Sequence, residues 1–243
     1  MLGKRKIATL VAEFLGTGIL TLLVLSVQRS TIGVPFFVAI IAGLVFVVMI
    51  YAFGDLSGAY LNPAVTIALW TARKVSSLRL ILLVAAELLG AWAASFVYGY
   101  FVNTKLTSIG GHFSGRTLAA ESVAAGVLGL AWGAAKFGHW SKAQKAGVIG
   151  VAVMLAMVLA SSGGIGIANP ALALGMRAWV WGTYALGPVI GAVVGVNLYG
   201  LLFAEDGALS FNLMPKVQVA SGSKSAPKKS TKKPAAKKRS TRK

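Results

Sequence analysis

The stretch Asn62-Pro63-Ala64 opens an apolar segment, 62–72, that is about half as long as the roughly 20 residues a membrane span requires. The same tripeptide returns 107 positions later as Asn169-Pro170-Ala171 and opens a second short apolar segment, 169–182. Asparagine is a good helix N-cap, and proline suits the first helical turn because it has no N–H to leave unpaired. Both segments are therefore predicted to be short helices with defined starts.

Six longer apolar stretches surround these segments, and each is long enough, or nearly so, to cross about 30 Å of hydrocarbon. Hydrophobic residues make up 56% of the 243 residues and charged residues 12%, whereas a soluble domain has about 25% charged residues. This composition excludes a soluble globular enzyme. The predicted fold is an all-α membrane protein with six transmembrane helices and two re-entrant half-helices. The predicted spans are 7–27, 35–54, 79–101, 117–136, 144–162 and 183–204.

The two halves of the chain repeat each other. Gly43 and Gly150 each lie nineteen residues before the asparagine of their own half, and Glu13 and Glu121 lie 49 and 48 residues before it. Each half holds three spans, an odd number, so the second half enters the membrane in the opposite sense and forms an inverted repeat. The predicted domains are an amino terminus at 1–6, a first repeat at 7–106, a second repeat at 107–206 and a tail at 207–243.

Basic residues gather on one side of this topology. By the positive-inside rule, both termini are predicted to be cytoplasmic, in a chain that spans the cell membrane. The four bases on or near the other side are Arg29, Lys105, Arg116 and Arg177. The cytoplasmic side receives Lys4, Arg5, Lys6, Arg73, Lys74, Arg79, Lys136, Lys142, Lys145 and the basic tail.

The tail accounts for much of the net charge of +18, because 207–243 holds eleven of the 24 basic residues and no acid. Self-repulsion and proline predict a disordered cytoplasmic segment. Anionic lipid is its expected partner. Nucleic acid is the less favoured alternative, since the stretch from Ser223 onward has no aromatic residue for stacking.

The two half-helices predict a pore. Irregular backbone at mid-membrane persists only where it is buried in protein or lines a water-filled cavity. Two half-helices that enter from opposite faces can meet with both positive dipole ends pointing at one place. Asn62 and Asn169 can then aim their amide NH₂ donors into the lumen, which favours neutral molecules with lone pairs over cations. The expected function is a passive channel for water or small neutral solutes.

The run Ser57-Gly58-Ala59-Tyr60-Leu61-Asn62-Pro63-Ala64-Val65-Thr66 resembles the first signature of the aquaporin (major intrinsic protein) family. The segments 12–17 and 186–192 resemble its opening and last helices. The resemblance implies one pore per subunit and a homotetramer. It also implies that Glu13 and Glu121 anchor the re-entrant loops by accepting backbone hydrogen bonds.

This sequence departs from the family at the constriction. The family usually has arginine three residues after the second asparagine, where this chain has Leu172. The family spacing assigns the other constriction positions to Ala42, Met157 and Gly166, none of which is ionisable. Such a filter is expected to be wider and less polar, and to admit solutes such as glycerol or hydrogen peroxide. Against this, the flexible Met157 could fold across the opening. Tyr60 also stands where the family usually has histidine.

Two functions other than a channel are compatible with inverted repeats, short helices and a basic tail. A secondary transporter can be built from inverted repeats and broken helices, but it needs a charged or ion-coordinating midplane. A membrane anchor that displays a basic arm would keep its function when Asn62 and Asn169 are substituted.

The chain has little chemistry for catalysis. It has no cysteine, two histidines and six acids, so no metal site, cofactor or enzymatic activity is predicted. Tryptophans near the predicted span ends, Trp132 among them, are expected to form interfacial belts.

Overall fold

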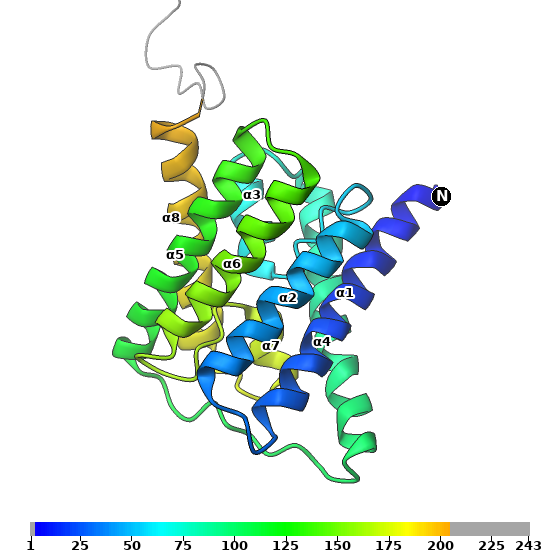
Figure 1. The fold of residues 1–243 in the computed structure, drawn as a ribbon, viewed down its shortest axis with the longest axis vertical. Helices are drawn as coiled ribbons and strands as arrows, with labels where there is room; N and C mark the ends of the chain where they lie inside the picture. Colours follow the sequence, from blue (N-terminus) through cyan, green and yellow to red (C-terminus); the bar gives the residue numbers. More distant parts are fainter. Residues whose placement is uncertain (1–2, 205–243) are drawn as a thin grey trace, which may run out of the picture. The chain divides into compact units, whose positions relative to one another are not determined.

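The computed structural model describes residues 3–204, which form helices joined by short loops (Figure 1). Among these residues, six helical stretches are long and apolar enough to cross a membrane, and the last of them, Trp181–Leu202, joins η1 to α8. The predicted all-α architecture of six spans plus short helices is confirmed; the predicted tail lies outside the described residues. The elements are α1 (Lys4–Gln28), α2 (Pro35–Phe53), α3 (Pro63–Thr71), α4 (Ser77–Phe101), α5 (Gly115–Phe137), α6 (Lys142–Ala160), α7 (Pro170–Gly175), the π-helix η1 (Trp181–Leu186) and α8 (Gly187–Leu202).

The second short helix differs most from its predicted length. The apolar run predicts it over 169–182, but α7 ends at Gly175. Arg177 has a left-handed φ of 62°, and the N–H of Ala178 donates to the Ala173 carbonyl oxygen at 2.8 Å. This closure is a Schellman motif, which stops a helix regardless of how apolar the following residues are.

Glycines let the long helices pack closely in pairs. A β-carbon at Gly43 of α2 would lie 2.5 Å from the carbonyl oxygen of Gly150 on α6, and one at Gly150 would lie 2.8 Å from that of Gly43. A β-carbon at Gly90 would collide with the backbone of α1, and one at Gly191 with the backbone of α5. Small residues at such crossings allow helix backbones to approach in a membrane, where van der Waals packing drives association.

We expect Gly150→Val to destabilise the α2–α6 pair. Its β-carbon would lie 2.5 Å from the side chain of Val47 as well as 2.8 Å from the Gly43 carbonyl oxygen, and overpacking of this kind costs about 1–3 kcal/mol. Gly147→Val is the matched control, because a β-carbon at this position of the same helix meets nothing within 4 Å. Thermal unfolding in detergent should show a lower melting temperature for Gly150→Val only. Equal melting temperatures would contradict the tight crossing.

The outer surface of the bundle is apolar. On α1, the exposed residues Ile7, Val11, Leu15, Ile19 and Leu23 recur every four positions and so form one stripe. The acids of the spanning helices lie in the interior, since Glu13, Glu87 and Glu121 are fully buried between helices. Apolar side chains outside and acids inside are the arrangement that a surrounding hydrocarbon phase favours.

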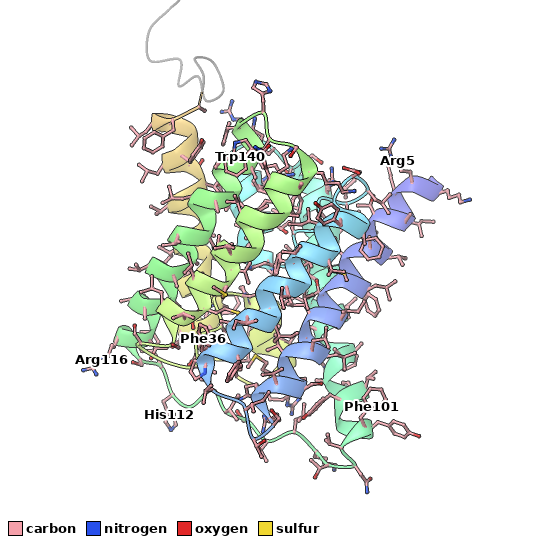
Figure 2. The ribbon with its side chains drawn as sticks, in the orientation of Figure 1. Arg5, Phe36, Phe101, His112, Arg116 and Trp140 are labelled. Atoms are coloured by element: carbon pink, nitrogen blue, oxygen red, sulfur yellow. The ribbon has the colours of Figure 1, made fainter. Side chains whose placement is uncertain are left out.

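The two ends of the bundle differ in charge. Figure 2 shows Arg5 and Trp140 at one end, and Phe101, His112 and Arg116 at the other. The first is called the amino-terminal end here, because α1 begins there; α4 and α6 begin and α5 ends at the same end. Nine of the basic residues between 3 and 204 belong to it, at the helix ends and in the loop after α3.

Candidate functional site

The two short helices begin beside each other inside the bundle. In Figure 1, α3 lies toward the amino-terminal end and α7 toward the opposite end. Nδ2 of Asn62 donates to the carbonyl oxygen of Ala168 at 3.0 Å, and Nδ2 of Asn169 donates to that of Leu61 at 2.9 Å. Each asparagine therefore bonds the residue that precedes the other asparagine, and these two bonds join the Asn-Pro-Ala segments directly.

Each asparagine also caps its own helix. Oδ1 of Asn62 accepts the N–H of Ala64 at 3.0 Å, and Oδ1 of Asn169 accepts the N–H of Ala171 at 2.9 Å. Pro63 and Pro170 follow as the first residues of α3 and α7. One hydrogen of each amide NH₂ is used by the bond to the other motif. At most one amide hydrogen per asparagine therefore remains to point into the lumen, where the NH₂ donors are predicted to point.

The residue before each asparagine has a strained backbone. Leu61 and Ala168 have left-handed φ angles of 50° and 49°, a conformation that costs an L-residue roughly 1–2 kcal/mol. The carboxylate of Glu13 accepts the N–H groups of Leu61 and its predecessor at 2.9 and 3.1 Å. Glu121 accepts those of Ala168 and its predecessor at 2.6 and 2.9 Å. Each loop is thus held by a bidentate carboxylate on one side and by the opposite asparagine on the other.

Glu87 of α4 makes a contact that the sequence does not assign. Its Oε1 accepts the hydroxyl of Thr66 on α3 at 2.6 Å, which ties the first short helix to α4. The loop before α3 has a further support, since a guanidinium nitrogen of Arg79 donates to the Ser57 carbonyl oxygen at 2.7 Å. For the Glu87–Thr66 contact, the only signal in the sequence is an acid within a predicted span, and this signal does not identify Thr66 as the partner.

A small cavity lies where the two motifs meet. Its volume is about 10 Å³, and a cavity needs about 10–15 Å³ to hold one water molecule. The two asparagines are its polar lining residues, and the others are apolar. The lining residues are Phe46, Asn62, Leu128, Val153, Met157, Ile167, Ala168, Asn169 and Leu172.

The four predicted constriction residues do not contribute equally. Met157 and Leu172 line the cavity. Gly166 lies directly against α6, because a β-carbon there would be 2.6 Å from the Met157 carbonyl oxygen. Ala42 is buried on α2, one turn from Phe46, which lines the cavity. The side chains of Phe46, Met157 and Leu172 close around this central space. A wider and less polar filter stays a prediction.

Three helices extend this wall toward the amino-terminal end. A second cavity of about 320 Å³ lies there, and its lining includes Ile50, Trp132 and Ile149. Each of these residues is one helical turn from a residue of α2, α5 or α6 that lines the small cavity. Trp132 is only 2% exposed, and its ring meets Tyr60 edge-to-face at a centroid distance of 5.4 Å. The expectation that Trp132 belongs to an interfacial belt is therefore wrong. The indole fits an interior position because α5 presents this side to the loop before α3.

Comparisons with known proteins agree with this arrangement. Residues 4–199 match the family model described as major intrinsic protein. Aquaporin Z from Photorhabdus laumondii is 30% identical, over 81% of this chain and 97% of its own length. The glycerol uptake facilitator protein from Escherichia coli is 29% identical, over 80% of this chain and 88% of its own length.

A solved structure supports the fold. The X-ray structure of the aquaglyceroporin from Plasmodium falciparum superimposes with a TM-score of 0.65, at 23% identity, over 80% of this chain and 95% of that one. The family consists of channels and not of enzymes. The chain therefore belongs to the major intrinsic protein family, as a multi-pass membrane channel of the aquaporin and glycerol facilitator type for water or small neutral solutes.

Proposed function

We propose that each chain forms one pore, which runs between α2, α5, α6 and the starts of the two short helices. The observation that carries this path is the pair of bonds between Asn62 and Ala168 and between Asn169 and Leu61. These bonds fix two polar side chains at the wall of a cavity that is otherwise apolar. A solute that passes there finds an amide hydrogen from each asparagine and few other polar partners.

The proposed selectivity constriction is Ala42, Met157, Gly166 and Leu172, which lacks the arginine usual in the family. Without that guanidinium, discrimination by hydrogen bonding is weak at this level. Glycerol and hydrogen peroxide are the proposed solutes besides water. Glycerol is supported by a relative whose name is glycerol uptake facilitator protein. Passage requires the Met157 side chain to swing aside, which its three rotatable bonds allow.

We assign the exclusion of cations at the centre of the pore to the two bonded Asn-Pro-Ala segments. Both helix starts direct their partial positive ends and the Asn62 and Asn169 donors toward the cavity. Glu13 and Glu121 act as loop anchors rather than as ion ligands, since the backbone N–H groups already occupy their oxygens. No acid among residues 3–204 lines the central cavity, so a cation there loses its hydration without gaining a carboxylate ligand.

The proposed setting follows from the charge distribution. The nine basic residues at the amino-terminal end favour placing that end in the cytoplasm of a cell, with both termini inside. The domains are then a cytoplasmic 1–6, two inverted repeats at 7–106 and 107–206, and a basic cytoplasmic tail, 207–243, that binds anionic lipid. The proposed assembly is a homotetramer with one pore per subunit.

Blocking the proposed path should stop transport. We expect Leu128→Trp to reduce water and glycerol flux at least tenfold, because Leu128 lines a cavity of about 10 Å³ that cannot also hold an indole. Val123→Trp on the same helix is the matched control, since Val123 is 60% exposed on the outer surface. Stopped-flow light scattering of proteoliposomes measures both fluxes.

Three results would overturn the proposed path. The first is a wild-type flux of water, glycerol and hydrogen peroxide that equals the flux in empty liposomes. The second is full flux in Leu128→Trp. The third is an equal loss of flux in Leu128→Trp and Val123→Trp. Flux that saturates and depends on an ion gradient would instead favour a coupled transporter.

A further inference from the structure

Lys136, near the end of α5, is held over two aromatic rings. Its Nζ lies 4.8 Å from the ring centroid of Tyr60 and 5.6 Å from that of Trp132. The two rings are themselves packed edge-to-face and are 4% and 2% exposed. A cation over the face of an aromatic ring is attracted by the ring quadrupole, and the attraction is stronger where water is excluded. The ammonium group is thus fixed in place by side chains of α5 and of the loop before α3.

This ammonium group stands at the mouth of the proposed pore. Lys136 and Trp132 both line the cavity of about 320 Å³, and Trp132 is one turn from Leu128, which lines the central cavity. Along α5, the order from the centre outward is therefore Leu128, Trp132, Lys136. A solute that moves from Asn62 toward the amino-terminal end has to pass the ring pair and then the charge.

The surroundings do not neutralise this charge. The titratable groups that act on Lys136 are three further bases, Lys74, Arg79 and Lys145, together with Glu13. Glu13 is fully buried, and its oxygens accept backbone N–H groups. A second acid, Asp55, lines the same cavity but is paired with Lys142 at 2.6 Å. The mouth therefore carries a net positive charge that faces the lumen.

Trp132 adds a donor at the same level. Its indole Nε1 is buried and has no hydrogen-bond partner among residues 3–204. A buried N–H without an acceptor is costly, and the indole has no acceptor atom to offer a cation. Lysine likewise offers donors and no acceptor, which suits the lone pairs of a neutral hydroxylic solute and repels a cation.

We propose that Lys136, positioned by Tyr60 and Trp132, is a specificity-determining residue that keeps cations out of the pore at its amino-terminal mouth. It supplies there the fixed positive charge that the constriction lacks at Leu172. This inference rests on the proposed path of the pore. It moves the charge filter from the outer constriction, where the family usually has it, to the opposite side of the asparagine pair.

The test compares Lys136→Gln with the wild-type chain in proteoliposomes. Proton entry is driven by a potassium diffusion potential set with valinomycin and is followed with an entrapped pH-sensitive dye; water flux is measured on the same vesicles. We expect Lys136→Gln to raise proton entry about tenfold or more, with water flux within about twofold of wild type. Lys136→Arg keeps the charge and should keep proton entry low. Arg73→Gln, the matched control, removes one exposed charge from the same end and should leave both fluxes unchanged.

Proton entry in Lys136→Gln equal to wild type, or raised equally by Arg73→Gln, would overturn the inference while leaving the pore itself intact. A rise in Lys136→Arg as large as in Lys136→Gln would also overturn it, because only the packing of the side chain would then matter. Failure of the pore proposal is seen separately, as wild-type water flux equal to that of empty liposomes.

Discussion

Asn169→Ala is expected to abolish water and glycerol flux and to lower the free energy of unfolding by about 2–4 kcal/mol. The substitution removes the oxygen that caps α7 through the Ala171 N–H and the amide nitrogen that bonds the Leu61 carbonyl oxygen at 2.9 Å. Loss of an N-cap costs about 1 kcal/mol, and a buried carbonyl group left without its donor adds about 1–3 kcal/mol. Flux stops because Leu61, strained at a φ of 50°, loses the bond to its carbonyl oxygen, which is one of the contacts that hold the loop in shape.

Asn169→Ser separates the two roles of this side chain. Serine caps a helix about as well as asparagine but is too short to reach the Leu61 carbonyl oxygen. The serine variant should therefore be about 1 kcal/mol more stable than the alanine variant and still conduct poorly. Chemical denaturation in detergent measures the stability, and stopped-flow measures the flux. Wild-type flux in Asn169→Ala would rule out the bonded motifs as the pore centre.

The starts of the short helices could be predicted because the chemistry that sets them is local. An asparagine side chain reaches the N–H two residues on, and proline has no N–H of its own, so neither interaction depends on the rest of the fold. Asn62 and Asn169 are the N-caps of α3 and α7, as the sequence predicts. The close crossings at Gly43 and Gly150 were predictable for a similar reason, since equal spacing from the motif places both glycines at one level.

The end of α7 could not be predicted from its residues. The chain reverses at Arg177, which adopts a left-handed φ without being glycine or asparagine. An arginine in an apolar run gives no signal of that conformation. Only the bond from the Ala178 N–H to the Ala173 carbonyl oxygen shows where the helix closes.

The interior of the proposed pore depends on tertiary packing, which local patterns do not specify. Nothing near Trp132 in the sequence shows that the loop bearing Tyr60 covers it, and its position near a span end indicates an interfacial residue. The width at Met157 likewise depends on side-chain rotamers, and a count of apolar residues does not reveal them. Residue types therefore allow a prediction of the polarity of the wall, whereas its width depends on how the side chains pack.

Leu172→Arg is expected to make the channel selective for water. Leu172 is 1% exposed and lines the central cavity with Met157 and Asn169. A guanidinium there adds five fixed N–H donors and a charge to a wall whose other polar groups are the two asparagines. Glycerol has to pass a longer, less compressible side chain, so we expect its flux to fall about tenfold relative to that of water, which corresponds to about 1.4 kcal/mol in the barrier. Proton entry should fall as well, because a second fixed cation then lies on the path.

The control for this variant is Leu172→Met, which keeps the volume and the apolar character of the side chain and should cost little stability. Its ratio of glycerol to water flux should match that of the wild-type chain. Both variants need the same melting temperature within a few degrees for the comparison to report selectivity rather than folding. An unchanged flux ratio in Leu172→Arg would show that the solute does not pass this residue, and the constriction would then have to lie elsewhere. A fall in glycerol flux in both variants would show that the shape of Leu172, and not the absence of a charge, sets the filter.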